Sequence, residues 1–413
     1  MLNLNREEKK TFILLLASTF LGGLFTSLSQ IQDIIAKKAL HSLDWQLTLL
    51  AMIWPVSNFF SIWWGKILEN SKNKKKYFVI VAFIGRLVLI FGLWVNNMTN
   101  FLLLLSLVYF FSSLLIPAVN SLYQNNIRRE VRGKLFGYTV SLGTLLSMLI
   151  TFISGRLLDM NELWYKQILF ATGITGCLSS LVLYFVDQKD KENHVERDFS
   201  FKELFITPIR RTFHLLKSNP DFAAFEKNFS IYGLGFLMVI PVIPILLVER
   251  LHMNYTNTFI AKGILSQVGI LLFSPLFGKL HDHKDIFQFG SLVFGILAIY
   301  QFGFVLATLS SSVFFATIIV LISYLIYGIA MSGVNVTWTM GSIYFAGDED
   351  ASMFQSVHIT LTGIRGLIAP LFGFAIYRVF GLTAVFLVAC FCEIYVSRLS
   401  YLRYKKRTSQ LLG

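Results

Sequence analysis

The sequence predicts an all-α integral membrane protein, with twelve transmembrane helices arranged as two related six-helix bundles. Of its 413 residues, 55% are hydrophobic and only 14% are charged, and the mean hydropathy is +0.64. The chain contains twelve apolar runs of about 20 residues, the length that crosses a hydrocarbon core of roughly 30 Å. A long polar stretch separates the sixth run from the seventh. This composition excludes disordered chains and ordinary water-soluble domains.

The twelve runs fall into two sets of six. The first set lies at 11–33, 44–65, 77–95, 101–124, 135–158 and 164–186, and the second at 222–248, 257–278, 286–308, 313–338, 353–377 and 380–402. We therefore expect an N-terminal bundle over residues 1–186, a cytoplasmic linker over 187–221 and a C-terminal bundle over 222–413. The first run is longer than the apolar core of a signal peptide, so we expect it to be retained as a helix.

The basic residues predict the orientation in the membrane. With these spans, 25 Lys and Arg residues fall on one side, and five fall on the other: Lys37, Lys38, Lys166, Arg250 and Arg378. By the positive-inside rule both termini lie in the cytoplasm, and an even number of spans also requires that they share a side. The net charge of +13 is thus a signal of topology and not of nucleic-acid binding. We expect a multi-pass protein of the plasma membrane, of the bacterial inner-membrane type.

The linker contains an apolar pattern with helical spacing. Its members predict an amphipathic helix at the membrane interface, interrupted at Pro208: Phe201, Leu204, Phe205, Thr212, Phe213 and Leu216. A flexible connector without such a helix is the alternative interpretation.

Polar residues recur at matching places in the two sets of runs, which indicates an internal repeat. The 101–124 run carries Tyr109, Ser113, Pro117, Asn120 and Gln124 near one helical face, and the 313–338 run carries Tyr324, Gly328, Met331, Asn335 and Trp338. A shift of 215 residues superposes Tyr109 on Tyr324 and Asn120 on Asn335. Parallel repeats of this kind place a substrate site between the halves near the midplane.

The 11–33 run carries a comparable polar stripe, and the 222–248 run carries a weaker one. The first consists of Thr19, Gly23, Thr26, Gln30 and Asp33, and the second of Asn228, Tyr232 and Gly235. Lipid offers these groups no hydrogen-bond partner, so we expect them to face protein or water. Packing between helices is the alternative to a cavity lining.

Two loops share a short motif. Gly65 is followed four positions later by Glu69 and then by a lysine cluster, and Gly278 is followed by Asp282 and then by His283 and Lys284. A glycine, an acid and a basic cluster in these two loops resemble the signature loop of the major facilitator superfamily of secondary transporters. The twelve spans, the cytoplasmic termini and the long central loop resemble that family as well.

The resemblance implies a gating role for these loops. A carboxylate at the start of a helix from the other half would be favoured by the helix dipole and would help to close one side of an alternating-access carrier. In family terms Glu69 would face the start of the 353–377 helix, and Asp282 would face the start of the 135–158 helix. Arg132 belongs to a basic loop that also resembles the family pattern. The alternative for each basic residue is a role in topology alone.

This chain departs from the family pattern in several places. Glu69 replaces the usual aspartate, and Asn70 stands where a basic residue is expected. The family's intramembrane arginine is absent from the 101–124 run, and the 135–158 run has no proline, unlike the family's drug and proton antiporters. The absence of this arginine from the 101–124 run argues against arginine-assisted proton coupling in that run.

Charges inside the apolar runs mark candidate functional groups, because each is costly in a bilayer. Arg365 lies in the middle of its run, with His358 and Thr362 at helical spacing on the same face. Its guanidinium suits a carboxylate or phosphate, on a substrate or in a structural ion pair. His358 is a proton-coupling candidate or a packing residue.

Further polar residues complete the candidate set. Asp33 and Glu226 are candidate coupling acids, and Gln267 is a candidate substrate contact on the 257–278 run. Arg86 and Glu393 lie on helices that pack at the periphery in this family, which implies structural roles.

The function favoured by the sequence is secondary transport of a small organic solute by alternating access, with an organic anion as the candidate that Arg365 suggests. No zinc spacing, phosphate-binding loop or nucleophile motif is present, so we expect no enzyme activity, no metal and no cofactor. The expected partners are the solute, the lipid bilayer and a coupling proton or sodium ion, without nucleic acid, and the expected state is a monomer. A transport-inactive receptor or assembly factor with a carrier fold and a lipid flippase are the alternatives.

Overall fold

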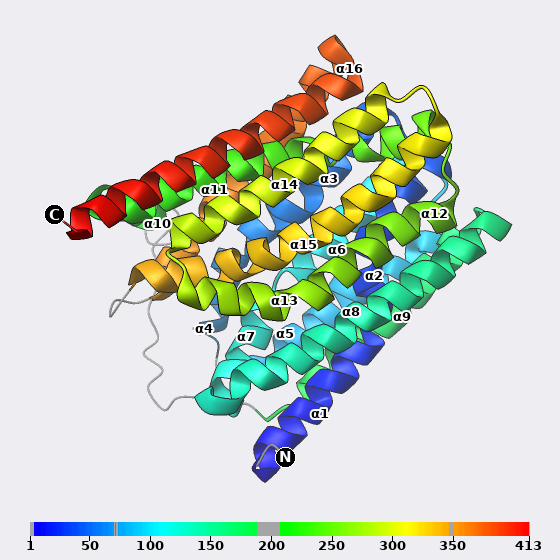
Figure 1. Ribbon diagram of the computed structural model, residues 1–413. Coiled ribbons are helices and arrows are strands. Elements are labelled where there is room, and N and C mark those ends of the chain that lie inside the picture. The colour runs from blue at the N-terminus through cyan, green and yellow to red at the C-terminus, as the bar shows by residue number, and fades with distance from the viewer. Residues whose placement is uncertain (1–3, 70, 72, 188–206, 347–350, 413) are drawn as a thin grey trace. The chain divides into compact units, whose positions relative to one another are not determined.

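The computed structural model describes residues 4–412 except 70, 72, 188–206 and 347–350, and these residues form helices joined by short connections (Figure 1). They fall into two compact units. The first contains residues 1–42 and 56–199, and the second contains residues 43–55 and 200–413. The first turns of α3 (Asp44–Phe59) therefore pack with the second unit.

Several spans of the first unit are broken by local features. The first span consists of α1 (Arg6–Leu21) and α2 (Gly23–Lys38), which meet at Gly22. The third consists of α5 (Lys75–Ile80), a π-helical segment (Val81–Arg86) and a 3₁₀ segment (Leu87–Trp94). The fourth is divided into α6 (Met98–Ser112) and α7 (Leu115–Asn126). The remaining helices are α4 (Ser61–Glu69), α8 (Arg129–Met160) and α9 (Trp164–Tyr184).

The second unit begins with α10 (Thr207–Ser218) and α11 (Pro220–Met238). It continues with a π-helical turn (Ile245–Arg250), α12 (Tyr255–Phe259), a second π-helical turn (Ile260–Leu265) and α13 (Ser266–His283). It ends with α14 (Ile286–Leu309), α15 (Val313–Ala346) and α16 (Ala351–Leu412). α16 packs against both α11 and α14, and α13 packs against α15 (Figure 1).

The described helices are consistent with the twelve predicted spans. Ten helical stretches are long and apolar enough to cross a membrane, and one of them, Val357–Gln410, is 54 residues long. That stretch contains two spans, because Gly381 adopts a φ of +82° that interrupts the helix. The seventh predicted run corresponds to α11 and the turn that follows it.

Polar caps fix where several helices begin. Asn5, Asn97, Asn219 and Asp285 each accept a backbone N–H two or three residues onward, at the starts of α1, α6, α11 and α14. Pro220 follows its cap at the first helical position, where a missing N–H costs nothing. Pro208 likewise lies in the first turn of α10, directly after Thr207, so the proline does not interrupt this helix. The part of the predicted amphipathic helix before Thr207 lies outside the described residues.

Close helix contacts depend on glycine at a few points. A Cβ on Gly328 of α15 would lie 2.9 Å from the Cα of Gly269 on α13, so neither position has room for a side chain. A Cβ on Gly366 would lie 2.1 Å from the Cβ of Pro55, which brings α3 against α16 inside the second unit. Small residues allow such backbone approaches in membrane bundles.

Candidate functional site

A cluster of ionisable side chains lies between α11 and the first part of α16. It consists of Glu226, His358, Thr362 and Arg365, and we call it the α11–α16 cluster. His358 Nδ1 and Glu226 Oε1 share a hydrogen bond of 2.8 Å, and both residues are only 1% exposed. Arg365 Nη2 donates to Thr362 Oγ1, and Arg365 also interacts electrostatically with Glu226. The structure thus brings together four residues singled out from the sequence.

Aromatic rings enclose this cluster. The His358 ring lies 4.3 Å from Trp338 and 4.8 Å from Phe229, measured between ring centroids. The guanidinium carbon of Arg365 lies 5.6 Å from the Phe229 centroid, within cation–π range. Apolar walls strengthen the electrostatic interactions of the charged groups that they surround.

Gly233 makes room for Arg365. A Cβ at this position on α11 would lie 2.8 Å from both Cδ and Nε of Arg365. Contacts below 3.0 Å force a displacement, so a larger residue here would move either the guanidinium or α11. The missing side chain at Gly233 therefore lets the arginine lie close to the axis of α11.

Several polar atoms of the cluster lack a hydrogen-bond partner within the described chain. They are Arg365 Nε and Nη1, Glu226 Oε2 and His358 Nε2. A buried polar group without a partner costs about 1–3 kcal/mol. Such a set in one place is typical of a site that is completed by a ligand or a proton.

A second buried carboxyl lies nearby on α16. Glu393 is fully buried, and neither of its side-chain oxygens has a partner among the described residues. A Cβ on Gly235 of α11 would lie 3.1 Å from Glu393 Oε1, so this glycine lets the carboxyl pack against α11.

The first unit contains a separate polar cluster. Tyr109 on α6 donates a 2.7 Å hydrogen bond to Gln32 Oε1 on α2. The guanidinium carbon of Arg86 lies 3.1 Å from the centroid of Phe25. Arg86 is expected from its span to be structural, and Gln32 is not singled out by the sequence. The polar stripe on the first span ends at Asp33, the residue after Gln32. This stripe is the sequence feature closest to Gln32.

The remaining candidate contacts are dispersed over their helices. Tyr109 and Tyr324 are 5% and 4% exposed, whereas Asn120 and Asn335 are both exposed, so the superposed pairs match in burial. Tyr109 and Asn120 lie on different helices, because the fourth span breaks between Ser112 and Leu115. Other positions are partly exposed: Gln30 and Asp33 on α2 and Gln267 on α13.

The predicted gating residues of the two loop motifs lie at or beyond the midpoints of α4 and α13. Asp282 is exposed and lies 3.9 Å from Nδ1 of His281, and Glu69 ends α4, its side chain being outside the described part of the structure. A Cβ on Gly278 would meet nothing within 4 Å, and one on Gly65 would meet only Pro117, at 3.9 Å. The gating roles of these residues stay predictions.

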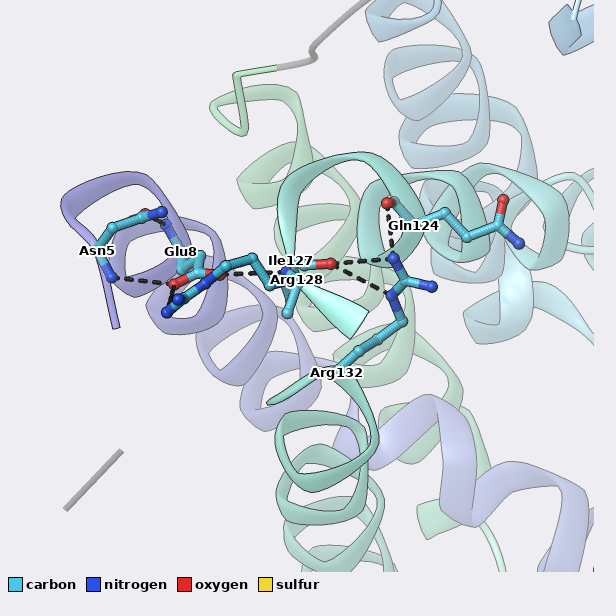
Figure 2. A network of polar contacts seen from close by, with 6 residues as sticks. All are labelled: Asn5, Glu8, Gln124, Ile127, Arg128 and Arg132. Carbon is cyan, nitrogen blue, oxygen red and sulfur yellow. Dashed lines mark hydrogen bonds and ion pairs between the residues drawn. The ribbon is translucent and has the colours of Figure 1, made fainter. Parts of the chain in front are cut away.

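Arg132 and Arg128 organise the turn between α7 and α8 (Figure 2). Arg132 donates to the backbone oxygens of Gln124 at 2.9 Å and Ile127 at 3.0 Å, which satisfies carbonyls at the end of α7. Arg128 donates two hydrogen bonds to the carboxylate of Glu8 on α1, from Nε to Oε1 at 2.8 Å and from Nη2 to Oε2 at 3.0 Å. This hydrogen-bonded carboxylate raises the pKa of Arg128 above its ordinary value.

The fold and the buried charges define a polytopic membrane transporter rather than an enzyme. The family model of the Major Facilitator Superfamily matches residues 10–370, and the chain belongs to that superfamily. No curated protein matches the sequence.

Solved structures of transporters share the fold. A mutant of the nucleoside transporter NupG aligns at a TM-score of 0.73 and 15% identity, covering 95% of this chain and 99% of that one. A D-xylose–proton symporter aligns at 0.70 and 12%, covering 96% and 97%. A bacterial homologue of the human lysosomal transporter Spinster aligns at 0.68 and 13%, covering 98% of each chain. At these identities the likeness concerns the fold.

Proposed function

We propose that this chain moves a small organic anion across the membrane by alternating access, coupled to a proton. In this proposal Arg365 receives the anionic group of the solute, and the Glu226–His358 pair takes up and releases the proton. The observation that carries the proposal is the α11–α16 cluster, in which Arg365 has two nitrogens without a partner among the described residues. The similarity to a proton symporter of the same fold is in keeping with it.

The balance of charges in the cluster supports the anionic character that we propose for the solute. Arg365 already has Thr362 as an acceptor, and Glu226, the acid with which it interacts electrostatically, bonds to His358. The guanidinium is therefore not matched by a carboxylate of its own. A carboxylate or phosphate on the solute would supply charge-assisted hydrogen bonds to it.

A proton fits the cluster better than sodium does. Hard cations take several oxygen ligands, whereas the cluster offers one carboxylate beside an imidazole and a guanidinium. Within the described residues, no group of three or more His, Cys, Asp or Glu is arranged to hold a metal ion. An imidazole beside a carboxylate offers a donor and acceptors for a single proton.

We further propose that the protein acts as a monomer in the bacterial inner membrane, with both termini in the cytoplasm. The support is the excess of basic residues on one side of the predicted spans. Single cysteines placed at Arg6 and Ser409 in a background lacking Cys177, Cys390 and Cys392 test the topology. Both should react with an impermeant thiol reagent only after the cytoplasmic face is opened.

Uptake into proteoliposomes tests the function. A panel of labelled organic anions, cations and neutral solutes is offered with and without an inward proton gradient. We expect gradient-driven uptake of an anion, loss of uptake in Arg365→Ala and normal uptake in Arg398→Ala, a matched change at an exposed arginine of the same helix. Equal transport by both variants would rule out the role of Arg365. If no solute moves while a protein partner copurifies, the receptor alternative is favoured, and movement of labelled lipid instead favours a flippase.

A further inference from the structure

A groove outside the buried clusters lies where α1, α5 and the end of α9 meet. It encloses about 610 Å³, and α9 packs against both α1 and α5. Its basic lining residues are Arg6, Lys9 and Lys10 of α1 and Lys75, the first residue of α5. We call it the α1–α5–α9 groove. All of its elements belong to the first unit.

The groove carries a net positive charge. Among the described residues, Asp187 is the one acid that lines the groove, and this carboxylate is shared between Lys10, with which it is hydrogen-bonded, and Lys75 at 3.9 Å. Glu8 directly precedes Lys9 in the sequence, but its carboxylate is bonded to Arg128 and to the backbone of Asn5. Four cations therefore face one carboxylate.

The α1 side of the groove changes from charged to apolar along the helix. Its lining residues are Arg6, Lys9, Lys10, Ile13 and Leu14, which follow the spacing of a single helical face. At 1.5 Å per residue, Ile13 lies roughly 5 Å beyond Lys9–Lys10 along the span. Ile13 is 53% exposed and Phe185, at the end of α9, is 62% exposed. A cationic rim thus leads directly onto apolar surface.

An aromatic residue marks the same level. Tyr184, the last residue of α9, is 42% exposed, and the Lys75 ammonium lies 5.7 Å from its ring centroid. Tyrosine is enriched where the bilayer meets water, because its ring is apolar and its hydroxyl is polar. We therefore expect the groove to lie at the depth of lipid headgroups.

We propose that the α1–α5–α9 groove binds the headgroup of an anionic phospholipid from the cytoplasmic leaflet. The phosphate would lie among the basic residues, and the acyl chains would cover Ile13 and Phe185. Basic pockets at the cytoplasmic side of membrane helices suit such headgroups. A soluble phosphate would leave the apolar half of the groove uncovered. The assignment to the cytoplasmic leaflet rests on the topology proposed above. Binding of the lipid does not depend on the identity of the transported solute.

Lipid titration of the full-length chain tests the site. The delipidated protein is titrated with phosphatidylglycerol or phosphatidylcholine, and bound lipid is counted by native mass spectrometry. The site variant carries Lys9→Gln, Lys10→Gln and Lys75→Gln. The control carries Lys279→Gln, Lys405→Gln and Lys406→Gln. These changes remove the same amount of charge outside the groove, and all three residues are predicted to lie on the same side of the membrane as the groove. A third arm measures thermal stabilisation by inorganic phosphate.

The expected result is tighter binding of phosphatidylglycerol than of phosphatidylcholine by the native chain. The site variant should lose at least tenfold in affinity for phosphatidylglycerol, because each basic residue near an anionic headgroup contributes roughly fivefold. The control should bind like the native chain. Equal losses in the two triple variants, or no preference between the lipids, would overturn the proposal. Stabilisation by inorganic phosphate equal to that by phosphatidylglycerol would overturn it too, because the apolar half would then play no part.

Discussion

Glu226 of α11 and His358 of α16 share a hydrogen bond of 2.8 Å, and each is only 1% exposed. The two residues are 132 positions apart in the sequence. An acid and an imidazole in this arrangement can hold one proton between them, because either group accepts a hydrogen bond when the other carries the proton. Arg365, two turns further along α16, adds a fixed positive charge to the same cluster.

Arg365→Lys tests whether the guanidinium recognises the solute through its geometry. A lysine keeps the charge but loses the planar fork of donors. We expect KM for the transported anion to rise about 10- to 100-fold, because a charge-assisted hydrogen bond is worth ~1.5–3 kcal/mol. Initial rates of uptake over a range of solute concentrations measure this. A native KM would show that the charge alone is sufficient.

Gly233→Ala tests the packing that positions Arg365. The added methyl group would lie 2.8 Å from Cδ and Nε of the arginine, so we expect a loss of about 1–3 kcal/mol in stability together with a raised KM. Gly137→Ala on α8 is the matched control, because its Cβ would meet nothing within 4 Å. Thermal melting in detergent and uptake kinetics provide the two readouts. If both alanine variants behave alike, close packing at Gly233 is not what holds Arg365.

Glu8 variants test the contact that ties α1 to the turn before α8. Glu8→Gln keeps an oxygen that can accept the Asn5 N–H but loses the negative charge that pairs with Arg128. Glu8→Ala loses both the oxygen and the charge. We expect Tm to fall by roughly 2–4 °C in the glutamine variant and further in the alanine variant. The exposed acid Glu162, changed to Gln, should leave Tm unchanged. Equal Tm values for native and Glu8→Ala chains would refute the contact.

Asp187→Asn tests the charge balance of the α1–α5–α9 groove. The hydrogen bond from Lys10, and then the charges of Lys10 and Lys75, hold the pKa of Asp187 below its ordinary value. A lowered pKa means that the contribution of this carboxylate to stability is present above an ordinary pKa near 4 and is lost as pH falls through the lowered value. The native groove should therefore bind phosphatidylglycerol more tightly only when the pH falls through this lowered pKa, below the ordinary value of Asp. At pH 7 we expect Asp187→Asn to bind it about fivefold more tightly. Weaker binding would contradict this charge balance.

Hydropathy predicts the large features of this fold because each span must be apolar over a fixed length. The sequence also places His358, Thr362 and Arg365 on one helical face, and the structure shows them together on α16. The partner of His358 is harder to predict. Glu226 is recognisable as an acid within a span, but its pairing depends on how α11 packs against α16.

The breaks in the helices could not be predicted from the sequence. The π-helical segment at Val81–Arg86 and the 3₁₀ segment after it depend on tertiary packing. A Cβ on Gly173 of α9 would lie 2.9 Å from the backbone nitrogen of Ile90, which shows how closely α9 approaches that segment. The contact between Arg86 and Phe25 likewise joins different helices, and no local pattern predicts it.

Proton-driven accumulation by Glu226→Gln tests most directly whether the α11–α16 cluster couples the solute to a proton. Glutamine keeps the size of the side chain but cannot exchange a proton. We expect the variant to exchange labelled solute across membranes at equal pH, as the native chain does, and to lose all accumulation driven by a pH gradient. Full gradient-driven accumulation by Glu226→Gln would contradict the proposed coupling.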